Sequence, residues 1–183
     1  MKATEYKGHP PYKADMSIFE RNTYTFLDKL GVNYTTLYHS PVFTMEECAE
    51  VENKLGTAIP KNLFLCNRQK TQFYLLMMPG SKVFKTRCLS AELGCARLSF
   101  ADERNMSDIL GIHPGAVSPM GLINDAAQRV LLVIDKELLQ CKTIGCHPCV
   151  NTATVRLSME DLLQKVVPQS GHEFRTINLK TES

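Results

Sequence analysis

No apolar run in this 183-residue sequence approaches the roughly 20 residues that a membrane-spanning helix needs. The first 15 residues, MKATEYKGHPPYKAD, also lack the apolar core of a signal peptide, so we expect a cytoplasmic protein without a membrane partner. The sequence carries little excess charge of either sign, with a net charge of +2. This value excludes a strongly polycationic nucleic-acid binder and still permits a local basic patch.

The signatures of several large enzyme classes are absent as well. The sequence contains no G-x-S-x-G elbow, no P-loop, no H-E-x-x-H and no G-x-G-x-x-G. The odd number of seven cysteines in a chain of this length favours reduced thiols over a disulfide framework. An enzyme with this sequence is therefore expected to position and polarise its substrate.

The spacing of apolar residues predicts one domain in which helices and strands are interspersed. Helices are expected from Asp15 to about Leu30 and, after capping boxes at 44–47 and 158–161, to about residues 56 and 167. Shorter helices are expected at 90–94 and 101–111, and strands at 34–38, 62–66, 73–78, 130–134, 152–157 and 174–179. We predict an α/β (α+β) domain over residues 15–183, with one mixed central sheet flanked by helices, after a flexible arm of residues 1–14.

Three loop-like segments are the strongest functional signal. They are AIPKNLFL at 58–65, GIHPGAVSP at 111–119 and GCHPCVNTATV at 145–155. Glycine, proline and histidine shape loops, and loops on a rigid scaffold commonly carry binding and catalytic groups. The functional interpretation depends on whether the three segments converge on one pocket.

Each segment has a chemical interpretation and a structural alternative. His147 can transfer a proton near neutral pH, with Asn151 and Thr152 close behind it, or it is a hydrogen-bonded structural histidine. The backbone amides of residues 115–119 can hold a carbonyl oxygen, or they form only a tight turn. Lys61 can pair with a phosphate, or it is simply solvated.

Zinc is an alternative for the cysteine-rich segment. Cys141, Cys146, His147 and Cys149 are ligand types that zinc prefers. Their C-x4-C-H-x-C spacing is poor, because neighbouring residues of an extended chain point to opposite sides. We expect no metal at this segment.

Five motifs in a fixed order resemble a known family. They are YHSPVFT at 38–44, PKNL at 60–63, RLSF at 97–100, LGIHPGAVSPMG at 110–121 and GCHPCVNTAT at 145–154. Together they resemble the prolyl-tRNA editing family, the YbaK-like and ProRS-associated aminoacyl-tRNA deacylase domains, over residues 16–178. The sequence looks most like the free-standing branch that removes alanine wrongly attached to proline tRNA.

The resemblance implies an ester hydrolase with a single α/β domain and no metal or organic cofactor. By position in the motifs, the implied catalytic residues are Lys61, which anchors the terminal adenosine through its phosphate, Gly115, His147 and Asn151. The implied substrate-binding residues are Asn62, Ala116, Val117, Ser118, Pro119, Thr152, Val42, Phe43 and Met45. Arg97 matches a basic position that faces the acceptor stem of tRNA.

The partner implied by the resemblance is the acceptor end of aminoacylated proline tRNA. Transient contact with prolyl-tRNA synthetase or an elongation factor is a further expectation. Three alternatives stay open: a deacylase for another mischarged amino acid such as cysteine on proline tRNA, a non-catalytic tRNA-binding or protein-binding module, and a zinc-dependent regulator.

Overall fold

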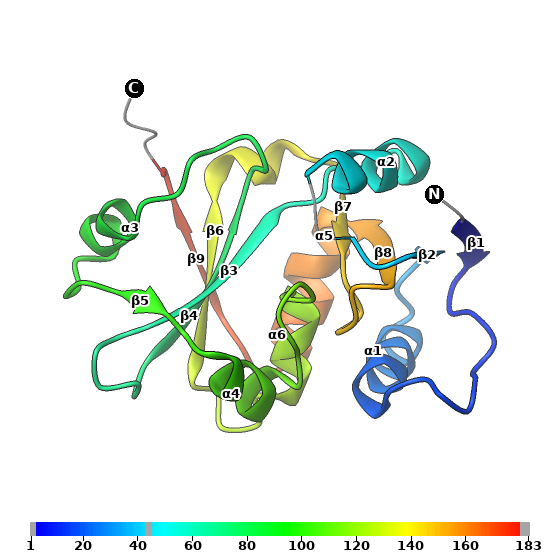
Figure 1. Cartoon of the computed structure of the whole chain (residues 1–183), viewed down its shortest axis with the longest axis horizontal. Coiled ribbons are helices and arrows are strands. Elements are labelled where there is room, and N and C mark those ends of the chain that lie inside the picture. The colour runs from blue at the N-terminus through cyan, green and yellow to red at the C-terminus, as the bar shows by residue number, and fades with distance from the viewer. Residues whose placement is uncertain (1–2, 43–44, 180–183) are drawn as a thin grey trace.

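Two β-sheets form the framework of the structure (Figure 1). The computed structural model describes residues 3–42 and 45–179, without the side chains of residues 45 and 46. The first sheet has the strand order β1-β2-β8-β7 and is antiparallel throughout. Its strands are β1 (Ala3–Lys7), β2 (Tyr34–His39), β7 (Thr143–Cys146) and β8 (Ala153–Ser158).

The second sheet is mixed and has the strand order β5-β3-β4-β6-β9. Its strands are β3 (Lys61–Cys66), β4 (Phe73–Met78), β5 (Ser99–Phe100), β6 (Val130–Asp135) and β9 (Phe174–Ile177). Strand β3 pairs antiparallel with β4 and β5, whereas β4, β6 and β9 run parallel. Lys61 begins β3 and is paired there with Met78 of β4, whereas β5 pairs only with the far end of β3, at Leu65 and Cys66.

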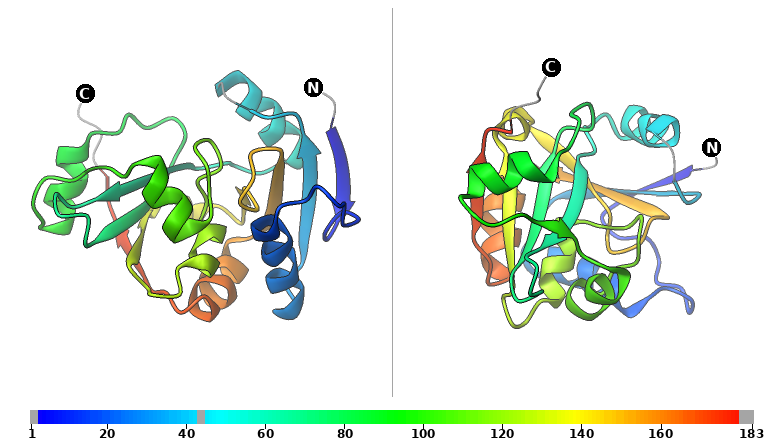
Figure 2. Two further views of the ribbon diagram at one scale, coloured as in Figure 1. Left: turned by 60° about the horizontal axis from the view of Figure 1, so that its bottom comes forward. Right: turned by 60° about the vertical axis from the view of Figure 1, so that its left-hand side comes forward.

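The helices flank these sheets. They are α1 (Ile18–Lys29), α2 (Met45–Leu55), α3 (Thr86–Leu93), α4 (Glu103–Asn105), α5 (Met159–Asp161) and α6 (Val167–Gln169). Two π-helical turns, η1 (Met106–Leu110) and η4 (Leu162–Val166), and two 3-10 helices, η2 (Pro119–Asn124) and η3 (Lys136–Gln140), complete the set. Figure 2 shows α1 and α2 near opposite ends of β2.

The largest apolar core lies between the two sheets. Leu132 of β6 points into this core together with Val155 of β8, whereas Val133 points to the opposite face of the mixed sheet, where Leu89 of α3 covers it. Strand β6 is thus buried on both faces, as its run of β-branched residues and leucines predicted. A third, smaller core joins Leu37 of β2 to α2.

The expected fold class is confirmed, with two differences. The strands divide between two sheets instead of one. Residues 3–7 are not a flexible arm, because they form β1 and pair with β2 from Ala3 opposite His39 to Lys7 opposite Thr35. This edge strand is held mainly by backbone hydrogen bonds, and its alternating polar sequence carries no strong strand signal.

Several predicted boundaries shift by a few residues. The helix expected at 90–94 spans Thr86–Leu93, and the expected helix at 101–111 divides into α4 and η1. The capping box at 158–161 is confirmed, since Ser158 Oγ accepts from the backbone N–H of Asp161 at 2.9 Å. The capping residue at 44 lies outside the described residues. Strands β1, β5 and β7 were not predicted.

The structure also bears on disulfides, metal sites and membrane-spanning helices. All seven cysteines are unpaired thiols, as expected. Within residues 3–42 and 45–179, no cluster of three or more His, Cys, Asp or Glu side chains has the arrangement of a metal site. Over the same residues, none of the helices combines the length and apolarity needed to cross a bilayer.

Candidate active site

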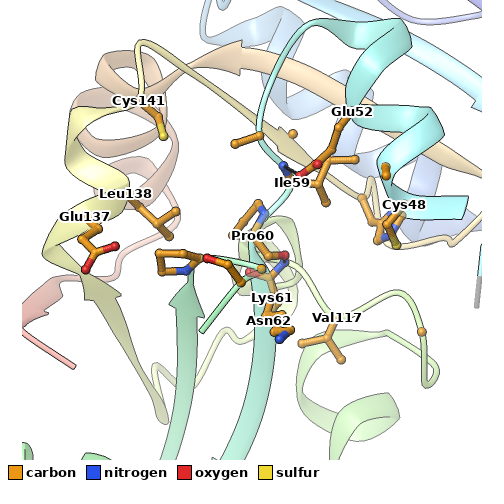
Figure 3. A pocket seen from close by; sticks show the side chains of 18 residues that line it. Cys48, Glu52, Ile59, Pro60, Lys61, Asn62, Val117, Glu137, Leu138 and Cys141 are labelled. Atoms are coloured by element: carbon orange, nitrogen blue, oxygen red, sulfur yellow. Dashed lines mark hydrogen bonds between the residues drawn. The ribbon is translucent and has the colours of Figure 1, made fainter. Parts of the chain in front are cut away.

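A cavity of about 740 Å³ opens where the two sheets meet (Figure 3). All three loop-like segments contribute to its wall, through Lys61, Gly115 and His147. The segment before β3 joins the sheets directly, because Gly145 N–H donates to Ala58 O at 2.8 Å. The chain thus brings residues that are far apart in sequence to one concave surface.

Lys61 lies near the centre of this cavity, with Glu137, Leu138 and Cys141 to one side and Cys48, Glu52 and Ile59 to the other (Figure 3). Its Nζ donates a hydrogen bond to Lys82 O at 3.0 Å. Within the described part of the chain, no carboxylate lies within ion-pair distance of Lys61. Its positive charge is therefore available to an anionic ligand.

The carbonyl that holds Lys61 is itself anchored by a buried ion pair. Lys82 Nζ lies 2.7 Å from both Asp135 Oδ2 and Glu137 Oε1 and donates to Leu179 O at 3.1 Å. Burial opposes the charged lysine, but the hydrogen bonds to Asp135 and Glu137 outweigh it and raise the pKa of Lys82. Lys82 stays charged and fixes the loop beside the cavity.

Gly115 occupies the third position of a tight turn. Ala116 N–H donates to His113 O at 3.1 Å, and Gly115 has φ +89° after a proline, which together describe a type II turn. The turn takes up the Ala116 amide, so the amides of Gly115 and Val117 are the ones left to face a ligand. Both residues line the cavity.

His147 is 9% exposed and its ring is oriented by the backbone of β8. The Nδ1 atom lies 2.7 Å from Ala153 O, which assigns the proton to Nδ1 and leaves Nε2 as an acceptor. The hydroxyl of Thr154 lies 3.4 Å from the same Nδ1 and 3.0 Å from His39 Nε2. Burial, together with the nearby His39 ring, lowers the pKa of His147, so its neutral form is favoured.

Asn62, Asn151 and Thr152 were also predicted as site residues, and only the first of them lines the cavity. Asn62 lines the cavity, and its Nδ2 donates to Pro60 O at 3.3 Å. The side chain of Asn151 lies against the turn, since a Cβ placed on Gly115 would lie 3.4 Å from Asn151 Nδ2. Thr152 O accepts a hydrogen bond from His39 N–H at 2.9 Å, so the backbone of Thr152 extends the pairing between β2 and β8.

Other predicted residues lie away from the cavity wall. Ala116 is buried in the main core, and Ser118 is fully buried with its Oγ accepting from Met120 N–H at the start of η2. Pro119 is the first residue of η2, and Val42 packs in the small core beside α2. Phe43 and the side chain of Met45 lie outside the described residues. Arg97 lines a second cavity that adjoins the first at Lys61.

The sequence did not single out several residues of the wall. They are Cys48 and Glu52 of α2, Pro79, Gly80 and Ser81 after β4, and Glu137 and Leu138 of η3. Cys141, which the sequence offered only as a zinc ligand, lies in the same wall. The proline-glycine pair at 79–80 is a recognisable turn signal. The residues on α2 and η3 carry no local signal, because only the packing of the sheets brings them to the cavity.

Known proteins are similar to this chain in sequence and in fold. The family model described as the aminoacyl-tRNA editing domain matches residues 39–165, which is more than half of the chain. The chain belongs to the aminoacyl-tRNA editing domain family. This membership confirms both the resemblance seen in the motifs and the expected enzyme class, an aminoacyl-tRNA hydrolase.

Two relatives of this editing domain are similar over most of their length. The prolyl-tRNA editing protein ProX of Acetoanaerobium sticklandii is 39% identical over 153 residues, covering 84% of this chain and 93% of ProX. The prolyl-tRNA synthetase associated domain-containing protein 1 of Danio rerio is 33% identical over 141 residues, covering 76% of each chain.

The fold of the editing domain also matches a solved structure. A candidate trans-editing enzyme for prolyl-tRNA synthetase superposes with a TM-score of 0.64 and 16% identity, covering 90% of this chain and 99% of the other. At this identity the match speaks for the fold alone, and it agrees with the two-sheet architecture described above.

Proposed function

We propose that this protein is a trans-editing deacylase that hydrolyses the ester bond of mischarged proline tRNA, with alanine as the preferred amino acid. Its relative ProX is by name a prolyl-tRNA editing protein. The observation that carries the proposal is that Lys61, Gly115 and His147 line one cavity of about 740 Å³. This volume is in the range of about 300–1,000 Å³ that binds small organic ligands, so the aminoacylated 3′ end can enter it.

Lys61 binds the phosphate of the terminal adenosine in this scheme. An ammonium group has three donors, and the described residues take up one of them through Lys82 O. The remaining donors and the charge are suited to phosphate oxygens. Asn62 adds an acceptor, because its Oδ1 is buried without a hydrogen-bond partner in the described part of the chain, and a substrate N–H or O–H would satisfy it.

The turn at Gly115 polarises the ester carbonyl. The amides of Gly115 and Val117 belong to residues of the cavity wall, and backbone N–H groups of this kind stabilise the oxyanion that forms when water attacks. Because Gly115 lies within the type II turn, the direction of its amide is fixed before the substrate binds, and it needs little reorganisation during the reaction. The side chain of Asn151 supports the turn from outside.

His147 orders and deprotonates the attacking water. Its Nδ1 proton is held by Ala153 O, so Nε2 is the nitrogen that can accept a proton. Water adds to the carbonyl carbon, the bond from that carbon to the ribose oxygen breaks, and the ribose oxygen takes up the proton. The neighbouring ribose hydroxyl can assist this transfer. The products are the free amino acid and tRNA with an intact 3′ end.

Selectivity for alanine follows from the size of the amino-acid subsite. A subsite that fits alanine excludes the larger proline ring by steric overlap, whereas a missing methylene alone is worth only about 1–3 kcal/mol. Discrimination among tRNAs must come from contacts outside this subsite, with Arg97 as the first candidate.

Hydrolysis of three charged forms of proline tRNA tests the proposal, with alanine, cysteine or proline attached. Wild-type protein should release alanine fastest and spare proline, and Lys61→Ala should slow release about a hundredfold or more while the protein stays folded. Lys29→Ala is the matched control, because Lys29 is an exposed lysine in the last turn of α1 away from the cavity.

The other outcomes separate the alternatives. Faster release of cysteine than of alanine would indicate a deacylase for cysteinyl-tRNA. Tight tRNA binding without turnover would indicate a non-catalytic binding module. Full activity in Lys61→Ala would refute the assigned role of this lysine.

A further inference from the structure

A second cavity of about 830 Å³ adjoins the first, and Lys61 lines both. Its other lining residues come from β3, from the start of α3 and the two residues before it, and from β5 and the segment before it: Leu63, Phe84, Lys85, Thr86, Arg87, Arg97 and Phe100. Figure 1 shows α3 and β5 at the end of the molecule opposite β1. The residue assigned to the terminal phosphate thus stands at the boundary between two cavities.

The two cavities differ in charge. The first contains Glu52 and Glu137 in its wall, whereas none of the described residues that line the second is acidic. The second contains three basic side chains besides Lys61, at positions 85, 87 and 97. Arg97 is exposed, and no ion pair joins it to another residue of the described chain. This charge distribution suits a phosphate-bearing ligand.

An aromatic pair forms part of the second cavity. The rings of Phe84 and Phe100 lie edge to face, with centroids 5.8 Å apart and an interplanar angle of 69°. Phe100 is 57% exposed although its strand is anchored by the pairing of Phe100 with Leu65. An ordered, exposed ring bordered by basic side chains is the combination that stacks unpaired nucleobases.

We propose that this second cavity binds the unpaired nucleotide that precedes the terminal adenosine, with its base stacked on the exposed ring of Phe100, which Phe84 supports edge to face. The inference rests on the proposed function. The phosphate on the 5′ side of the terminal adenosine joins the two nucleotides, so a strand with that phosphate on Lys61 has the adenosine in the first cavity and the preceding nucleotide in the second. Arg97 then contacts the next phosphate along the strand.

The test compares a substrate that contains this nucleotide with one that lacks every nucleotide before the terminal adenosine. One is alanyl-tRNA with the proline tRNA sequence, and the other is adenosine 5′-monophosphate carrying alanine on its ribose. Phe100→Ala should lower kcat/KM about tenfold or more on the tRNA, as expected for loss of one stacked base, and leave the mononucleotide unchanged. Phe100→Tyr should retain activity on both substrates.

The control variants are measured on the same two substrates. Tyr12→Ala removes another exposed ring, 45% exposed and outside both cavities, and should have no effect. Equal losses on both substrates in Phe100→Ala, or no loss on either, would overturn the second subsite. A Lys61→Ala protein with full activity on the mononucleotide would instead refute the proposed function.

Binding gives an independent readout. A single-stranded oligonucleotide with the sequence of the tRNA 3′ end, labelled for fluorescence anisotropy, should bind Phe100→Ala about tenfold more weakly than wild type. Equal binding by the wild type and Phe100→Ala would overturn the subsite. This result does not depend on ester hydrolysis, so it tests the second subsite separately from the proposed deacylase activity.

Discussion

His147 acquires a defined chemical state from its immediate surroundings. Its Nδ1 proton is committed to Ala153 O, and Thr154 links its ring to His39, whose own Nδ1 lies 2.8 Å from Ser40 O. Burial lowers the pKa of both histidines, so the neutral form of each ring is favoured. A single side chain is thus prepared to accept a proton at Nε2.

The lowered pKa of His147 predicts a loss of stability at acid pH. Above the ordinary value of 6.5 the residue is neutral in the folded and the unfolded chain, and its contribution to stability is fully present. As pH falls below 6.5, the unfolded chain binds a proton before the folded protein does, so the free energy of unfolding decreases until pH passes the folded-state pKa. Urea unfolding at about pH 7.5 and about pH 5.5 measures this change.

Two variants make that measurement specific. His147→Gln should reduce the difference in stability between the two pH values. His113→Gln is the control, because the His113 side chain is 79% exposed and lies outside the cavity wall. If His147→Gln kept the full pH dependence of the wild type, the assigned role of burial at His147 would be wrong.

At the scale of elements, the proline-glycine pair at 114–115 forms a type II turn over residues 113–116. Proline in the second position and glycine in the third are what a type II turn requires, since the third residue has positive φ. The signal was visible in the sequence. Its consequence, that the Ala116 amide is used internally, became clear only from the hydrogen bond to His113 O.

Gly115→Ala should impair catalysis more than stability. A Cβ is strained at φ +89°, so we expect the turn to shift, and with it the amides proposed to hold the ester carbonyl. We expect stability to fall by about 1 kcal/mol and deacylation to slow on the order of a hundredfold. Thermal unfolding and single-turnover kinetics measure the two effects.

Gly31→Ala is the matched control for the strain. Gly31 also has positive φ, +60°, but a Cβ there meets nothing within 4 Å, and the residue lies after α1 away from the cavity. Its variant should lose comparable stability and keep wild-type deacylation. Similar kinetics in both variants would show that the turn does not position the carbonyl.

At the scale of the whole molecule, Lys82 ties together segments that the chain keeps far apart. It follows β4, and its Nζ contacts Asp135 at the end of β6 and the carbonyl of Leu179 after β9. Its own carbonyl holds Lys61 at the start of β3. The stability of the mixed sheet and the position of Lys61, the residue proposed to bind phosphate, therefore both depend on the buried ion pair between Lys82 and Asp135.

Lys82→Met should destabilise the protein by about 3 kcal/mol, because Asp135 is fully buried and would keep a charge without its partner. Deacylation should also slow, since the loop that orients Lys61 loses its anchor. Urea unfolding and steady-state kinetics measure the two losses, and Lys82→Met with Asp135→Asn should recover part of the stability.

Lys70→Met is the control for that change. Lys70 forms an ion pair with Asp102 at 2.6 Å, but both side chains are about half exposed, so water replaces the lost contact. This variant should alter stability far less. A loss in Lys70→Met as large as that in Lys82→Met would contradict the importance of burial.

The sequence by itself determined most of the elements and the chemical inventory of the site. The strand Phe73–Met78 was predicted with its observed bounds, because a continuous apolar run between polar turns has few other solutions. Lys61, Gly115 and His147 were identified because lysine, glycine and histidine in loop-like segments carry local signals. The edge strands β1 and β5 were missed because backbone pairing with a neighbour, and not their own pattern, makes them strands.

Only the tertiary structure decided which residues meet. The division into two sheets, the cavity wall supplied by α2 and η3, and the anchor from Lys82 to Lys61 all join segments that are distant in the chain. Periodicity and capping report on a few consecutive residues, whereas these contacts depend on how the sheets pack. Ser118 shows the limit of a motif: it stands in the expected loop, yet its buried side chain caps η2 and does not line the cavity.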